Sequence, residues 1–333
     1  MKFGLRLIGY LGNAHELVRL AVLAEQAGFD YVWFPHDTFM GNTWVITSAV
    51  ATQTSRIRIG SVGTNPYTTN PAEIATYIAT LDDLSRGRAV LGLGLHTEHM
   101  VEWTGIDASD YMLRTREAVE IIRALMRGEV VDYQGEAFQW TEQCYLRFKP
   151  LRDEIPIYVC AFGPEYLAMS GAIGDGSLPM ITPPESAEYM VSAITGGARD
   201  AGRDPAEVDI AGCAWLSLAP DRGEATQVLR QMVSYFGSYL EAPALAAIGL
   251  SPEDFEPLGR LVEAGRYDEA ANLVTDEMTD LAIRGTPDDV IRRIETVADM
   301  GITQISLGGP LGPDPIEAIR LMGEKVIPYF RSG

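Results

Sequence analysis

The sequence has few positive charges, and almost all of them are arginine. Its 333 residues carry 26 Lys and Arg against 46 Asp and Glu, a formal net charge of -20 at pH 7, and the only lysines are Lys2, Lys149 and Lys325. Nucleic acids and anionic membrane surfaces repel such a chain, so neither is expected as a partner. The arginines are suited to binding phosphate and carboxylate groups.

Cysteine and long apolar runs are also scarce. The three cysteines, Cys144, Cys160 and Cys213, are odd in number and widely spaced, which fits a reduced compartment and predicts no metal site. No apolar run reaches the roughly 20 residues of a membrane span, and the opening MKFGLRLIGY is typical of a short strand, not of a signal peptide. We therefore expect a soluble, cytoplasmic protein.

Residues 57–94 contain the clearest structural pattern, a strand, a loop, a helix and a second strand. Ile57, Ile59 and Val62 are β-branched, as in a buried strand, and Pro71 is suited to the first turn of a helix that Gly87 ends. The stretch 89–94, AVLGLG, is apolar on both faces and must be covered on both sides. This unit predicts a parallel sheet or a barrel.

The same alternation recurs along the whole chain. Strands are predicted over 3–8, 31–34, 57–62, 89–94, 155–160, 176–181, 208–218 and 302–307, and helices over 14–27, 44–54, 71–84, 114–126, 166–173, 186–201, 222–240, 287–300 and 315–330. Eight such units favour an α/β fold of the (β/α)8 TIM-barrel type. An open doubly wound sheet is the alternative, but Gly92-Leu93-Gly94 does not continue into a dinucleotide-binding fingerprint.

No linker divides the chain, so we expect residues 1–333 to form one domain. Two segments break the alternation and are expected as insertions that shape substrate access: 128–149, with short antiparallel strands around Gly135, and 243–279, which is helical.

Three of the four histidines follow predicted strands, at the barrel end where such folds place their chemistry. His36 could exchange a proton beside a bound ring, with Asp37 setting its tautomer, or it could be structural. His96 and His99, with Glu98, resemble metal ligands only weakly, because no further ligands with fitting spacing appear. We favour Gly94, Leu95 and His96 facing a cofactor and Glu98 and His99 facing substrate, although His99 fits a solvated loop equally well.

Two loops of small residues are the most informative. Gly63-Thr64-Asn65-Pro66 and Ala161-Phe162-Gly163-Pro164 each precede a helix, which would let backbone approach a flat ring or a phosphate, although turn formation alone explains such residues too. The aromatic residues Tyr10, Phe39 and Trp44 lie near strand ends and could wall a pocket, but isolated aromatics are more often core residues.

Four stretches carry a resemblance to a known family. Residues 24–37 (AEQAGFDYVWFPHD), 57–94, 155–179 (IPIYVCAFGPEYLAMSGAIGDGSLP) and 284–294 (RGTPDDVIRRI) resemble the bacterial-luciferase-like barrel oxidoreductases, and within them the coenzyme-F420-dependent methylene-tetrahydromethanopterin reductase branch. The resemblance implies a luciferase-like TIM barrel that transfers a hydride between coenzyme F420, a deazaflavin, and a small organic substrate. It also implies a homodimer, for which we expect helices 44–54 and 71–84, with Ile74 and Ile78, to form the interface.

The resemblance also implies where the cofactor lies. Its ring would rest on a bulge at Val62-Gly63-Thr64 that contains a cis non-proline peptide, and His36 would lie near its reactive edge. The expected catalytic residues are His36, Asp37 and Glu98, and the expected substrate-binding residues are Tyr10, Phe39, Trp44 and His99. The expected cofactor-binding residues are Val62, Gly63, Thr64, Asn65, Gly94, Leu95, His96, Ala161, Phe162, Gly163 and Pro164.

Two positions depart from that branch. Its reductases carry an acidic residue in strand one, where this chain has Arg6, and an aspartate before the histidine, where this chain has Pro35 and places Asp37 after His36. The substrate therefore stays open. The alternatives are an FMN-dependent luciferase-like monooxygenase, a flavin-free NAD(P)H-dependent reductase and a catalytically silent flavin-binding protein.

Overall fold

A computed structural model describes residues 1–94 and 101–331. Parallel strands close into a ring: β1 pairs with β2, the pairing continues strand by strand to β7, and β9 joins β7 back to β1. The strands are β1 (Lys2–Arg6), β2 (Tyr31–Pro35), β3 (Arg58–Val62), β4 (Ala89–Gly94), β5 (Ile157–Cys160), β6 (Gly176–Ser177), β7 (Asp209–Leu218) and β9 (Gln304–Leu311). The predicted (β/α)8 barrel is confirmed.

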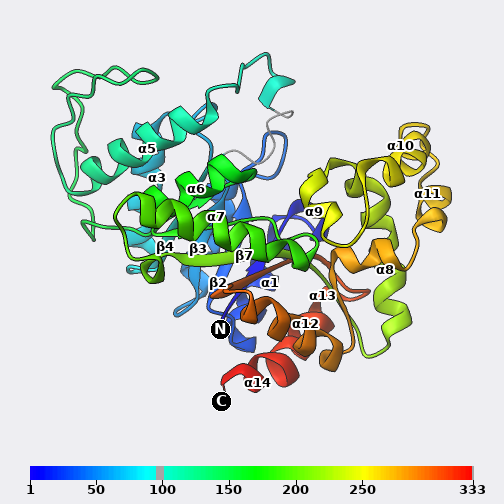
Figure 1. Cartoon of the computed structure of the whole chain (residues 1–333). Coiled ribbons are helices and arrows are strands. Elements are labelled where there is room, and N and C mark those ends of the chain that lie inside the picture. Colours follow the sequence, from blue (N-terminus) through cyan, green and yellow to red (C-terminus); the bar gives the residue numbers. More distant parts are fainter. Residues whose placement is uncertain (95–100, 332–333) are drawn as a thin grey trace.

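Helices surround the barrel and follow its strands (Figure 1). Residues that favour helix ends fix several of the predicted boundaries: Asn13 caps α1, Gly28 ends it in the left-handed region at φ 91°, and Pro71 begins α3. The helices are α1 (Ala14–Ala27), α2 (Thr43–Gln53), α3 (Pro71–Ser85), α5 (Tyr111–Met126), α6 (Pro164–Ile173), α7 (Ala187–Asp200), α8 (Arg222–Phe236), α9 (Ala242–Ala246), α10 (Glu256–Glu263), α11 (Tyr267–Leu273), α12 (Pro287–Asp299), α13 (Pro315–Leu321) and α14 (Ile327–Arg331).

Some boundaries differ from the sequence prediction. The helix expected over 222–240 ends at Phe236, and the closing helix is interrupted by a π-helical turn over Met322–Val326. The strand expected over 176–181 is reduced to Gly176–Ser177, and a short strand that we did not predict, β8 (Ile283–Gly285), pairs with the end of β7 outside the ring. Such short strands depend on pairing with a distant partner and leave little periodicity to detect.

The two irregular segments differ in position. Within 128–149 the expected strands reduce to one antiparallel bridge, Gln134 to Gln139, and the Glu117 carboxylate of α5 accepts the backbone N–H of Phe138. This hairpin therefore lies against α5. Residues 243–279 contain α9, α10 and α11, which lie beside α8 (Figure 1). These helices pack around an apolar cluster that includes Leu229, Phe255 and Leu258.

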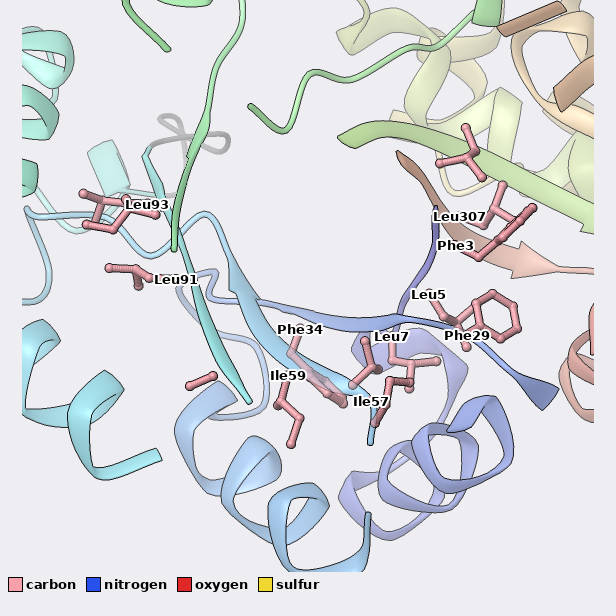
Figure 2. Close-up of a cluster of buried hydrophobic side chains, with 14 of the residues drawn as sticks. Phe3, Leu5, Leu7, Phe29, Phe34, Ile57, Ile59, Leu91, Leu93 and Leu307 are labelled. Atoms are coloured by element: carbon pink, nitrogen blue, oxygen red, sulfur yellow. The ribbon is translucent and has the colours of Figure 1, made fainter. Parts of the chain in front are cut away.

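Alternation along the strands separates two layers of side chains. Phe3, Leu5 and Leu7 point outward with Ile59 and Leu91 into the layer beneath the helices (Figure 2). Tyr31 and Trp33 point into the barrel, where their rings stack at a centroid distance of 5.5 Å and the indole N–H donates to Gln304 Oε1 at 3.1 Å. The barrel interior is thus filled at the level of Trp33, which leaves the strand ends above it for binding.

Ile74 and Ile78 are fully buried within this chain, so our expectation that they contribute to a dimer interface is wrong. Across residues 1–94 and 101–331, no helix is both long and apolar enough to cross a membrane.

Candidate active site at the barrel mouth

His36 follows β2 directly and faces the mouth of the barrel. Its backbone N–H donates to the Val62 carbonyl at 3.1 Å, which fixes the loop, and its ring lies 6.0 Å from that of Trp44. Nδ1 is buried and has no hydrogen-bond partner among residues 1–94 and 101–331, so Asp37 does not set the tautomer through this atom. Burial lowers the pKa of His36 below its usual value, although the Asp37 carboxylate partly opposes this shift. The imidazole is therefore neutral at pH 7.

The loop after β3 combines positive backbone φ with buried polar atoms. Gly63 has φ 67°, and Thr64 is fully buried with a hydroxyl that no described residue partners. The Asn65 side-chain oxygen accepts from the backbone of Tyr67 and Thr68. The expected cis peptide at Val62-Gly63-Thr64 is wrong, because these peptide bonds are trans. Glycine at position 63 supplies the unusual turn without one.

Gly94 ends β4 in a position that no side chain fits. Its φ is 140°, and a Cβ atom would lie 2.5 Å from the Cys160 carbonyl oxygen and 2.7 Å from the Tyr166 hydroxyl. The absent side chain keeps the backbone of β4 and β5 close together at the mouth. Leu95, His96, Glu98 and His99, which follow, lie outside the described residues.

The loop after β5 leads into the N-terminus of α6. Ala161 is buried, the Phe162 ring stacks on Tyr111 at 5.3 Å, and Pro164 occupies the first helical turn. Gly163 adopts φ 66°, and its N–H donates to Glu241 Oε1 at 3.1 Å. A carboxylate from the segment before α9 thus occupies the end of α6 where a phosphate would be favoured.

The three aromatic residues expected to bind substrate lie at different depths. Tyr10 is 53% exposed, yet its hydroxyl lies against Gly309 and burial there raises the pKa of Tyr10 to about 12, against the opposing charge of Arg6. Trp44 lies between His36 and Tyr77, and its indole N–H is buried with no partner in the segments that the structure describes. Phe39 is 73% exposed, with its ring 6.4 Å from Trp103.

Several buried polar atoms at the strand ends have no partner within the described residues. They are Arg6 Nε, His36 Nδ1, Thr64 Oγ1 and Thr182 Oγ1, with Trp44 Nε1 at the start of α2; a sixth such atom, Ser306 Oγ, lies within β9. Buried polar groups in proteins are almost always hydrogen-bonded, so a concentration of exceptions at one end of a barrel indicates a place where a ligand or water completes the bonding.

Sequence reasoning missed two side chains at this mouth, those of Arg6 and Glu241. Arg6 could have been found as the one charge between apolar residues in FGLRLIG, in phase with Gly4 and out of phase with Leu5 and Leu7. Glu241 leaves no comparable signal, because its contact with Gly163 joins residues 78 positions apart.

Known proteins match this chain over nearly its whole length. The family of luciferase-like monooxygenases matches residues 3–304. The 5,10-methylenetetrahydromethanopterin reductase of Archaeoglobus fulgidus is 37% identical, over 99% of this chain and 100% of that protein.

Two solved structures share the fold. The coenzyme F420 dependent tetrahydromethanopterin reductase of Methanopyrus kandleri has a TM-score of 0.93 at 29% identity and covers 99% of both chains. An F420-dependent secondary alcohol dehydrogenase, solved with an F420-acetone adduct, has a TM-score of 0.78 at 25% identity and covers 98% of both chains. The strand order of the barrel, the match over residues 3–304 and these relatives together show that the chain belongs to the luciferase-like monooxygenase family.

Proposed function

We propose that this protein is an oxidoreductase that transfers a hydride between coenzyme F420 and a small organic substrate. The observation that carries the proposal is the backbone match, at a TM-score of 0.93 over 99% of both chains, to a reductase that uses this coenzyme. A family name alone would not choose between a deazaflavin and a flavin, since the family description refers to monooxygenases.

The residues at the mouth fit such a cofactor. Gly63 has positive φ and carries no side chain over the backbone that a flat ring would approach, while Gly94 lets the ends of β4 and β5 lie close together beside it. The unpartnered Thr64 hydroxyl can bond to polar atoms of a ring, and the Gly163 N–H already binds an anionic oxygen, that of Glu241. We propose Val62 to Asn65, Gly94 and Ala161 to Pro164 as the cofactor-binding residues.

When bound, F420 would supply a two-electron hydride carrier whose reactive ring position is carbon. The chain's own task is to orient the reactants and exclude water. His36 is proposed to exchange a proton with the substrate, because a neutral imidazole can both donate and accept near pH 7. Trp44 would form the wall against which His36 is held.

Titration of the purified protein with F420, FMN and NADPH tests the proposal directly. We expect saturable binding of F420 and its reduction or re-oxidation in the presence of a substrate panel that includes methylene-tetrahydropterins, secondary alcohols and sugar phosphates. Tight FMN binding without F420 binding would overturn it and favour the FMN-dependent monooxygenase. F420 binding without turnover on the whole panel would favour a cofactor-binding protein without catalysis.

We also propose a cytoplasmic homodimer. The three cysteines are unpaired, as expected in a reducing compartment. Helices α2 and α3 expose Val45 at 68%, Leu84 at 44% and Tyr77 at 37%, which are apolar side chains that a second copy would cover.

A further inference from the structure

Arg6 is a cationic side chain that points into the barrel. It is the last residue of β1 and pairs with Trp33 of β2, while its neighbours Leu5 and Leu7 point outward into the core beneath the helices. Its guanidinium reaches past the neighbouring strand β9, and one Nη donates to the Ala214 carbonyl of β7 at 2.9 Å.

Most of the hydrogen-bonding capacity of Arg6 is unused. A guanidinium has five N–H donors, and the described residues offer Arg6 one oxygen, at Ala214, and a distant sulfur, that of Met180 at 3.9 Å. Nε is buried without a partner. No carboxylate of residues 1–94 or 101–331 forms an ion pair with Arg6, in contrast to Arg152, which binds the buried Asp82. An arginine with only a structural role would be better satisfied.

Two glycines of β9 make room for this group and for a second donor. A Cβ atom at Gly308 would lie 2.7 Å from an Nη atom of Arg6, and one at Gly309 would lie 2.3 Å from the Tyr10 hydroxyl. The Tyr10 hydroxyl is protonated at pH 7, as a tyrosine of ordinary pKa would be, and burial raises its pKa further, to about 12. A charged donor and a neutral donor therefore border the same stretch of β9.

This pair lies across the mouth from the proposed cofactor residues. Those residues follow β3, β4 and β5, whereas Arg6 belongs to β1 and contacts β7 and β9. Arg6 and Asp37 both act electrostatically on Cys160, so the cation and the proposed catalytic loop share one mouth. In a chain of net charge -20, an anionic substrate would need such a local cation to enter.

We propose that Arg6, assisted by the Tyr10 hydroxyl, binds a carboxylate or phosphate group of the substrate, which is therefore a small organic anion. The claim that this anion is the substrate rests on the proposed function. The claim that Arg6 binds an anion does not require it. Planar guanidinium groups match these two anions and bind them through paired hydrogen bonds.

Calorimetric titration with two acid and amide pairs, propionate with propionamide and benzoate with benzamide, tests the proposal with and without F420. The variants are Arg6→Gln, Arg6→Lys and Tyr10→Phe, with Arg19→Gln on the exposed face of α1 as the matched loss of one positive charge. Wild type should bind at least one acid more tightly than its amide. Arg6→Gln should weaken acid binding about ten- to hundredfold and leave amide binding unchanged.

Arg6→Lys and Tyr10→Phe should each weaken acid binding severalfold, and Arg19→Gln should not. Tyr10→Phe retains the ring, so it tests the site even if Arg6→Gln does not fold, as circular dichroism would reveal. Equal binding of acids and amides by wild type would overturn the proposal, as would equal effects of Arg6→Gln and Arg19→Gln. A parallel loss of F420 affinity in Arg6→Gln would assign the arginine to the cofactor's anionic groups instead. If F420 binds neither wild type nor the variants while acid binding still depends on Arg6, the proposed function is rejected and the anion site is not.

Discussion

Replacement of His36 by asparagine is the most direct test of the proposed chemistry. The imidazole is neutral, its Nδ1 finds no partner in the described part of the chain, and it lies beside Trp44 at the end of β2. Asparagine preserves a polar side chain of similar reach but cannot exchange a proton near neutral pH.

The expected cost follows from that loss. General acid or base catalysis contributes at least roughly 10²-fold to turnover, which corresponds to about 2.7 kcal/mol of transition-state stabilisation. The His36 backbone bond to Val62 is independent of the side chain, so the loop and the cofactor-binding residues after β3 should keep their positions. We therefore expect turnover to fall roughly 10²-fold or more while F420 affinity changes much less.

The assay is the re-oxidation of reduced F420 by the acceptor that the substrate panel identifies, together with an F420 binding titration. His15→Asn, on the exposed start of α1, is the matched control and should leave both quantities unchanged. Turnover near the wild-type value in a folded His36→Asn protein would refute the argument, and Asp37, Glu98 and His99 would then be tested as the proton source.

Four further predictions concern other parts of the molecule. Glu241→Gln should bind F420 severalfold more tightly in a titration, because the carboxylate at Gly163 competes with the cofactor's phosphate, and a weaker affinity would contradict this. Gly94→Ala should lower the free energy of unfolding in urea by at least about 2 kcal/mol, since its Cβ would meet the Cys160 carbonyl, whereas Gly196→Ala, with open space around it, should not. Light scattering should give the mass of a dimer for wild type and of a monomer for Val45→Glu on α2. A monomer mass for wild type would contradict the proposed homodimer. The pKa of His36 is lower in the folded than in the unfolded chain, so the unfolded chain takes up more protons below about pH 6.5. In urea unfolding, acidification should therefore destabilise wild type more than His36→Asn. An equal change of the unfolding free energy with pH in the two proteins would contradict this.

The sequence by itself determined the architecture, because the signals for it are local. The period-two pattern of FGLRLIG predicts β1, Pro71 and Gly28 predict a helix start and a helix end, and the apolar stretch AVLGLG predicts a strand covered on both faces. Each of these depends on residues a few positions apart. Their repetition along the chain was enough to predict the closed barrel and its functional end.

Only the tertiary structure decided which side chains meet at the mouth. Three features join residues far apart in the sequence. They are the contact of Glu241 with Gly163, the contacts of the Arg6 guanidinium with β7 and β9, and the pairing of β8 with β7. Burial is likewise a tertiary property: Ile78 and Tyr77 are adjacent on α3, yet one is fully covered by the barrel wall and the other is 37% exposed. The His36 pKa and the unpartnered Thr64 hydroxyl follow from that same packing, because removal from water shifts a titration or leaves a hydroxyl without a partner only once distant segments have closed around it.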